Sequence, residues 1–214
     1  WRPEGPEGPV RDIYAFAVEG GAPNVPGPLI RVPAGTEIQM FVRNRLPVAL
    51  KLHGIGPRPM VKDEFITMPA GGKTLQFRFK AGAPGTYYYW GQTADSLFTN
   101  RTGVDAQLTG ALIVDAPGAE PNADRVFVIG EWLGPIPPAG QARKFTIVVN
   151  GRSWPHTERL SVPFGLPIEW RVINGAFGPH PMHLHGTFYT VGSRATALRD
   201  VIYGLPNTRL VTTQ

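Results

Sequence analysis

Residues 32–44 read VPAGTEIQMFVRN, and this stretch decides the fold that the sequence predicts. After a turn that contains Pro and Gly, the apolar residues Ile38, Met40 and Val42 recur at every second position. A period of two is typical of a β-strand that buries one of its faces. The stretch therefore predicts a strand that enters a sandwich or barrel from a tight turn.

Similar short runs recur along the chain between turns rich in Gly and Pro. Residues 74–80 and 167–172 also alternate, which predicts antiparallel strands. Residues 111–114 and 126–129 are continuously apolar, which predicts strands buried on both faces. Apart from short helical pieces expected near residues 93–98, the sequence predicts an all-β fold.

The first stretch has a second copy later in the chain. Residues 162–174 read VPFGLPIEWRVIN and match residues 32–44 at an offset of 130 (162 − 32 = 130). His53 and His185, each between Leu and Gly, match at an offset of 132 (185 − 53 = 132), which indicates a two-residue difference in loop length. Two copies of one β unit predict a tandem β-sandwich or barrel.

A polar stretch rich in Pro, Gly and Ala, residues 115–124, separates the two copies. We therefore expect a first domain over residues 1–116, a linker over 117–123 and a second domain over 124–214. The second copy is the shorter one, and we expect it to lack its last strands at the C-terminus.

The composition of the 214 residues excludes several classes of protein. The hydrophobic fraction of 42% supports a packed core, and the net charge of +5 comes from scattered Lys and Arg, so no nucleic-acid partner is expected. The chain has no Cys, which excludes a thiolate ligand within it. No apolar run approaches the roughly 20 residues of a membrane span. The chain opens at Trp1 without Met or a signal peptide, so we expect a removed leader or an internal piece of a longer protein.

The chemistry is concentrated in residues 180–186, which read HPMHLHG. On a strand, His183 and His185 would share one face, with Leu184 on the other and roughly 6 to 7 Å between the Cβ atoms of the two His. Two imidazoles at this spacing can hold one metal or point at two metals of a cluster. His180 lies across the bend imposed by Pro181 and can aim elsewhere. Neutral imidazoles suit Cu, Zn, Fe or Ni.

These residues resemble the motif His-Pro-x-His-Leu-His-Gly of the multicopper oxidases, the laccase-like enzymes. Residues 28–35, 85–89 and 103–114 resemble further strands of that family's cupredoxin domains. The resemblance implies two tandem cupredoxin-like Greek-key β-barrels or sandwiches, the second incomplete. It also implies copper as the cofactor, with His180 at a mononuclear copper and with His183 and His185 at the type 2 and type 3 coppers of a trinuclear cluster.

The resemblance further implies an activity and a compartment. Members couple the one-electron oxidation of a phenol-like compound, an aromatic amine or a metal ion to the reduction of O2 to water, with electrons passing along a His-Cys-His strand. An extracytoplasmic location, periplasmic or secreted, is implied in the same way.

The chain departs from the family pattern at several ligand positions. The first-domain motifs read KLHG at residues 51–54 and WGQ at residues 90–92, so Lys51, Trp90 and Gln92 stand where the family has His. Lys and Trp do not serve as copper ligands there. We expect a copper-free first domain in which His53 is structural. The absent His-Cys-His strand implies that a further C-terminal part, or a neighbouring domain or subunit, completes the copper cluster, and that this chain alone is inactive.

Two other functions stay open on the sequence. One is a copper nitrite-reductase-like or mononuclear His-metal β-barrel enzyme, and the other is a non-catalytic copper-binding cupredoxin module. The remaining candidate residues have simpler interpretations as turn, core or surface groups: His156 in a turn, Met60 and Met182 as core filler, Tyr87 to Trp90 as packing, Asp95, Asp105 and Glu131 as surface or turn charges, and Asn100 as a glycosylation acceptor.

Overall fold

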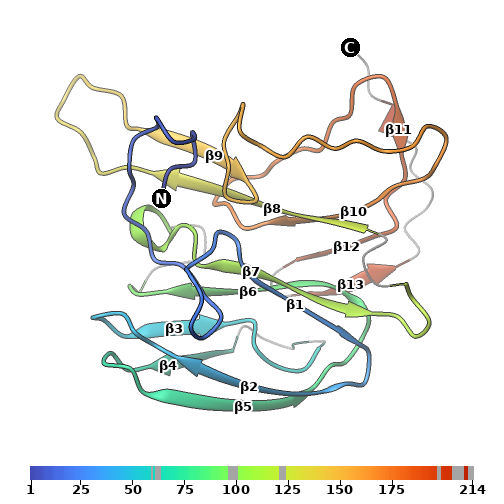
Figure 1. Ribbon diagram of the computed structural model, residues 1–214, viewed down its shortest axis with the longest axis horizontal. Helices are drawn as coiled ribbons and strands as arrows, with labels where there is room; N and C mark the ends of the chain where they lie inside the picture. The colour runs from blue at the N-terminus through green and yellow to red at the C-terminus, as the bar shows by residue number, and fades with distance from the viewer. Residues whose placement is uncertain are drawn as a thin grey trace.

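The protein is a stack of β-sheets (Figure 1). The computed structural model describes residues 1–58, 60, 64–95, 101–120, 124–196, 199–203 and 210–211. Within these ranges the one helical element is the short 3-10 helix η2, Gly103–Asp105, so the all-β prediction is confirmed. The same ranges contain no helix with the length and apolar character that crossing a membrane requires. The helical piece expected near residues 93–98 lies mostly outside the described residues.

The first repeat forms two facing sheets. The larger sheet has the strand order β1-β7-β6-β3-β4, and the smaller sheet pairs β2 with β5. β1 runs parallel to β7, and the other neighbours in these two sheets are antiparallel. The strands are β1 Gly27–Pro33, β2 Glu37–Arg43, β3 Leu50–His53, β4 Phe65–Met68, β5 Thr74–Lys80, β6 Gly85–Gln92 and β7 Thr109–Asp115.

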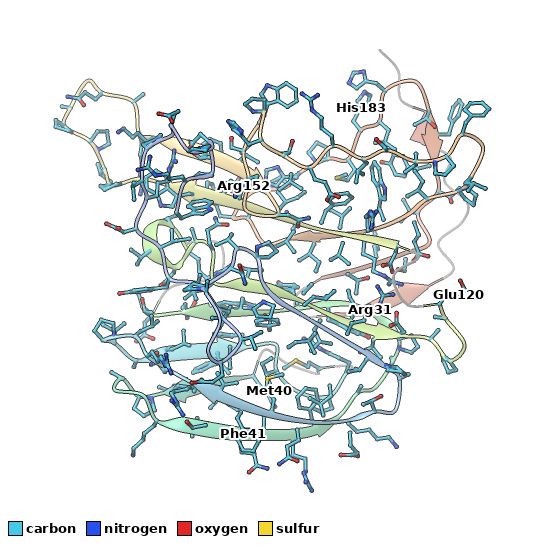
Figure 2. All side chains as sticks on the ribbon, viewed as in Figure 1. Arg31, Met40, Phe41, Glu120, Arg152 and His183 are labelled. Atoms are coloured by element: carbon cyan, nitrogen blue, oxygen red, sulfur yellow. The ribbon has the colours of Figure 1, made fainter. Side chains whose placement is uncertain are left out.

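The apolar residues that alternate along β2 form the face of the strand that is turned away from solvent. Ile38 is buried, Met40 and Val42 are half-buried, and the residues between them face solvent. Ile38 and Met40 lie opposite Phe79 and Phe77 of β5, so the two strands present one apolar face to the larger sheet. Phe41 faces solvent on the opposite side from Met40 (Figure 2).

The larger sheet is covered on both faces because a third sheet packs behind it. The third sheet has the order β10-β8-β9 and consists of β8 Asp124–Leu133, β9 Phe145–Val149 and β10 Glu169–Asn174. Ala111 of β7 packs with Val128 and Ile173 of this sheet, while Leu112 and Val114 face the β2–β5 side. Every residue of β7 is therefore buried, as the continuous apolar run predicts.

The remainder of the second repeat contains short strands. β11 Phe188–Tyr189 pairs with β14 Leu210–Val211, and β12 Ser193–Thr196 pairs with β13 Arg199–Tyr203. In Figure 1 these strands lie at the side of the molecule where the C-terminus ends. The two copies share a sequence pattern, but this part of the second repeat forms short two-stranded sheets where the first repeat forms longer strands.

The two repeats share a turn that follows the repeated strand. Asn44 Oδ1 accepts a hydrogen bond from the backbone N–H of Leu46, and Asn174 Oδ1 accepts one from Ala176. Asn44 Nδ2 donates to Val48 O and Asn174 Nδ2 donates to Gly178 O, each at 2.9 Å. An Asn side chain that closes its own turn in this way is a local determinant of structure. The sequence offset of 130 therefore corresponds to a repeated structure.

Charged side chains join the two repeats across the predicted linker. Arg31 on β1 donates to Asp115 at 2.7 Å and to Asp124 at 2.7 Å, and Asp124 also pairs with Arg171 on β10. The two carboxylates hold the pKa of Arg31 above its usual range. Burial raises the pKa of Asp124, but hydrogen bonds from Arg31 and Arg171 outweigh it and leave that pKa below its usual value.

The N-terminal residues also contact the second repeat. Trp1 Nε1 donates to Gly151 O at 3.0 Å, and Arg11 pairs with Glu4 and donates to Thr146 on β9 at 2.7 Å. Residues 1–11 precede the first repeat in sequence. They nevertheless contact β9 of the third sheet and the turn that follows it. The division into domains at residues 117–123 stays a prediction.

Three expectations about local structure were wrong. Residues 180–186 form no paired strand, because no neighbouring strand of the described chain hydrogen-bonds to them and Pro181 lacks a donor N–H. Asp105 and Glu131 are buried rather than surface charges. Asp105 accepts hydrogen bonds from Thr93, and Glu131 accepts them from backbone N–H groups, which supplies the compensation that burial of a carboxylate requires.

Removal of Arg31 should strongly destabilise the fold. In Arg31→Ala, Asp115 and Asp124 stay buried without this cation, and we expect the free energy of unfolding at pH 7 to fall by about 3–5 kcal/mol. Because the folded pKa of Asp124 is lowered, its stabilising contribution is complete above the unfolded pKa of about 3.9 and is lost as the pH falls through the folded pKa. The difference between variant and wild type should therefore shrink in acid.

Denaturant unfolding at several pH values measures this effect. Arg45→Ala is a suitable control, because Arg45 is 66% exposed and its pair with Glu19 lies at the surface. A loss in Arg31→Ala no larger than that in the control would contradict a structural role for the Arg31 network.

Candidate metal centre

The three predicted ligands lie in the segment between β10 and β11. The segment leaves the Asn174 turn, passes Pro181 and ends at Gly186, whose φ of +73° favours glycine. Gly54, its counterpart in the first repeat, has a φ of +75°. His183 and His185 are exposed and His180 is half-buried. Figure 2 shows His183 at the end of the molecule opposite Phe41.

His183 and His185 form a close pair of rings. Their centroids lie 4.6 Å apart with an angle of 88° between the ring planes. Leu184 between them is half-buried while both His are exposed, so the side chains alternate as in a strand although the backbone is unpaired. Two neutral imidazoles held this close offer nitrogen donors to one metal ion or to two neighbouring ions.

His180 faces a different group. Its Nε2 lies 3.0 Å from Oε1 of Glu131, a buried carboxylate on β8. The other oxygen of Glu131 accepts backbone N–H bonds from Phe177 at 3.1 Å and from Gly178 at 3.3 Å. His180 thus contacts a buried carboxylate, whereas His183 and His185 contact each other.

The His segment does not complete a metal site by itself. Among the residues that the structure describes, no three His, Cys, Asp or Glu side chains converge on one point that could hold a metal ion. His180, His183 and His185 therefore offer donors of the right chemistry for copper but fewer than a stable centre requires.

The corresponding positions of the first repeat come together on two strands. β3 and β6 are antiparallel neighbours in which Lys51 lies opposite Gln92 and His53 lies opposite Trp90. These four residues stand at the positions where the family pattern has His. The fold therefore gathers these positions at one place, but three of the four residues are not His.

Aromatic rings and cations fill this place in a continuous stack. His53 is 3% exposed and stacks on Trp90, with ring centroids 3.6 Å apart and 10° between the planes. The Phe65 ring lies on the His53 side at 5.1 Å. Two cations make cation–π contacts with the outer rings. Arg101 lies 5.0 Å from the Trp90 ring centroid, and Lys51 lies 4.8 Å from that of Phe65. This packing supports the structural interpretation of His53.

Arg101 fixes one end of the stack to the second repeat. Its guanidinium donates to Gly91 O, Asp105 O and Leu108 O, to Thr109 Oγ1 and, across the sheets, to Gly175 O at 3.3 Å. Burial lowers the pKa of Arg101 to about 10, while nearby groups including Asp105 oppose that change. Gly175 lies in the Asn174 turn, so one buried cation links the stack to the start of the His segment.

The other candidates are structural or peripheral. Tyr87 and Tyr89 are buried in the core, which agrees with their interpretation as packing residues. His156 is exposed in a bend next to Gly5. Met182 is 41% exposed and is not core filler, and Met60 is half-buried. Asp95 pairs with Lys51 at the surface. Asn100 lies outside the described residues.

Glu131 and Arg101 are the residues whose importance the sequence did not reveal. A charged residue in a strand that is otherwise largely apolar, such as Glu131 in residues 124–133, is the one signal that could have identified it. Arg101 has no comparable local signal, because its acceptors come from separate loops and from the second repeat.

Family models match both halves of the chain. A model described as multicopper oxidase matches residues 16–118, and a second model with the same description matches residues 136–209. Together they account for most of the sequence.

Two relatives each match more than half of this chain. The chain is 31% identical over 127 residues to a probable nitrite reductase-hydroxylamine oxidoreductase fusion protein of Kuenenia stuttgartiensis, covering 55% of this chain and 15% of that protein. It is 30% identical over 132 residues to copper resistance protein A of Pseudomonas syringae pv. tomato, covering 58% of this chain and 20% of that protein. The chain thus spans about a fifth or less of the length of these relatives.

The blue copper oxidase of Nitrosomonas europaea has a similar fold. Its crystal structure aligns with a TM-score of 0.63 at 23% identity, over 88% of this chain and 64% of that one. This likeness confirms the predicted cupredoxin fold.

The stack at His53 predicts a large effect of its central ring on stability. Trp90→Ala removes the ring between Arg101 and His53, and we expect the free energy of unfolding to fall by about 3–5 kcal/mol, as for other buried aromatics. Trp154→Ala is the matched control because Trp154 is 77% exposed, and it should change stability little. Thermal or denaturant unfolding compares the two, and equal effects would contradict the packing role of Trp90.

Proposed function

Because the chain belongs to the multicopper oxidase family, we propose that it is part of an oxidoreductase that couples oxidation of a reductant to reduction of O2 to water. His180, His183 and His185 are its copper ligands in this proposal. The observation that carries it is the edge-on His183–His185 pair, with centroids 4.6 Å apart, in a segment that lies within the matched residues 136–209.

The geometry supports the assignment of these ligands to two different copper sites. The exposed rings of His183 and His185 face one region together, whereas His180 is turned toward Glu131. This fits a division in which His180 serves a mononuclear copper and the pair serves a cluster. Copper, when bound, supplies the one-electron chemistry, and the chain supplies the orientation of the imidazoles.

The proposed centre needs donors that the described chain does not gather. A further C-terminal part, or a neighbouring domain or subunit, supplies them in this proposal. The proposed organisation is a first domain over residues 1–116, a linker over 117–123 and a second domain over 124–214. The packing of Ala111 of β7 against Val128 of β8 and Ile173 of β10 supports an arrangement in which the first domain serves as a scaffold.

The first domain is proposed to hold no copper. The positions that carry His in the family are filled here by Lys51, Trp90 and Gln92, with His53 stacked between rings. A buried, stacked imidazole between Trp90 and Phe65 has no open approach for a cluster. The reductant class, a phenol-like compound, an aromatic amine or a metal ion, and an extracytoplasmic location follow from the family alone.

Copper binding tests the ligand assignment. We expect the double variant His183→Ala/His185→Ala to bind copper about tenfold more weakly or worse, because both nitrogen donors of the pair are lost. His53→Gln and His156→Ala are the controls and should bind as the wild type does. Competition with a chelator of known affinity measures the change, and a loss in His53→Gln equal to that of the double variant would refute the assignment.

Catalysis is tested separately from binding. The chain alone, loaded with copper, should consume O2 no faster than the same copper and reductant without protein, since it contains no Cys and too few His donors for the full centre. Rapid O2 consumption by this chain would contradict the proposed need for further ligands. In the longer protein, O2 consumption supports the oxidase, and reduction of nitrite without O2 consumption favours the nitrite-reductase-like alternative.

A further inference from the structure

Glu131 is a buried carboxylate in an unexpected place. Its side chain is 5% exposed on β8, and its strand partner across the sheet is Ile147 of β9. Burial of an ionised carboxylate among apolar strands is costly unless hydrogen bonds or a cation compensate it. The stability of this buried carboxylate therefore depends on the groups that it contacts.

Both oxygens of Glu131 are directed at the chain that leads to His180. Oε2 accepts the backbone N–H bonds of Phe177 and Gly178, and Oε1 lies 3.0 Å from Nε2 of His180. The last contact is at ion-pair distance, but its geometry is not that of a hydrogen bond. The backbone of Glu131 is itself fixed, because Gln107 Nε2 donates to Glu131 O at 3.2 Å.

The chemistry of the pair determines which imidazole nitrogen carries the proton. An ionised carboxylate only accepts hydrogen bonds, so the nitrogen that faces it is the one that bears hydrogen in the neutral ring. Nε2 of His180 is that nitrogen, which leaves the lone pair of Nδ1 available. A metal-bound His commonly donates its other N–H to a carboxylate, and Glu131 is the carboxylate that lies beside Nε2 here.

The first repeat offers an internal comparison. In the shared turn the counterpart of Gly178 is Val48 (178 − 48 = 130), whose carbonyl oxygen accepts the same hydrogen bond from the Asn side chain. Asn44 and Asn174 thus have equivalent roles, and the two turns correspond up to this position. The carboxylate contact thus occurs in the repeat that carries the His and goes beyond what the shared turn requires.

We propose that Glu131 is a positioning residue that holds the 177–180 segment and fixes His180 with Nε2 protonated and Nδ1 presented to copper. This inference rests on the proposed function for the identity of the metal. The contacts to Phe177 and Gly178 set the path of the backbone, and the contact to Nε2 sets the orientation and tautomer of the ring.

The wild-type chain without metal provides the first test. Long-range ¹H–¹⁵N correlation spectra at pH 8, where a free imidazole is neutral, report the tautomer of each His ring. We expect His180 to be the Nε2–H tautomer. A predominant Nδ1–H tautomer at His180 in the wild type would overturn the inference, and this measurement requires no variant to fold.

The variant Glu131→Gln provides the second test. Its amide can present N–H donors to His180, so the ring should shift toward the Nδ1–H tautomer, and copper affinity should fall about tenfold or more. Glu169→Gln removes the same charge at a side chain that is 63% exposed, and it should change neither property. An unchanged His180 tautomer in folded Glu131→Gln would overturn the inference.

Addition of copper(II) alone separates the inference from the proposed function. Selective broadening of the His180 signals in the wild type supports both. If the His180 tautomers are as expected in wild type and Glu131→Gln, but copper does not broaden the His180 signals, the positioning role is supported and His180 is refuted as a copper ligand. Equal broadening in wild type and Glu131→Gln, with equal tautomers, would refute the positioning role and leave the ligand assignment intact.

Discussion

The buried guanidinium of Arg101 holds together the loops around the ligand positions of the first repeat and ties them to the turn that begins the His segment. It is 3% exposed, has hydrogen bonds to backbone acceptors around β6, η2 and β7, and reaches Gly175 in the second repeat. It also covers the Trp90 ring, which stacks on His53. A buried cation is tolerated only where acceptors surround it, so these loops are constrained together. The first repeat is therefore filled and rigid where the family pattern has metal ligands, and it is tied to the turn from which the His segment departs.

This constraint explains how one repeated unit has two roles. Both copies retain the strand, the Asn-closed turn and the glycine of positive φ that ends the motif. In the first copy, rings and cations occupy the ligand positions, and the result is a stable sheet covered on both faces. In the second copy, the imidazoles stay exposed or face a carboxylate, which preserves their capacity to bind a metal. Packed rings and cations fill the ligand positions of the first repeat, whereas the proposed ligands of the second repeat are not packed in this way.

Much of the fold was predictable because its determinants are local. The alternation of residues 37–43 became the face pattern of β2, and the continuous run at residues 111–114 became the doubly buried β7. The sequence repeat identified the shared turn, although the hydrogen bonds of Asn44 and Asn174 had to be seen in the structure. The alternation at residues 183–185 gave the correct side-chain orientations but the wrong backbone, because a strand requires a hydrogen-bonding neighbour that local sequence does not reveal. The burial of Glu131 was missed for a related reason: its donors lie 46 and 47 residues away.

The position of copper in crystals of the copper-loaded protein tests most directly whether copper binds at the His segment and not in the first repeat. Anomalous difference maps recorded on the two sides of the copper absorption edge locate the metal without reference to activity. We expect density at the rings of His183 and His185 and at Nδ1 of His180, and none between β3 and β6 at His53. Copper density between β3 and β6, with none at residues 180–185, would contradict this expectation.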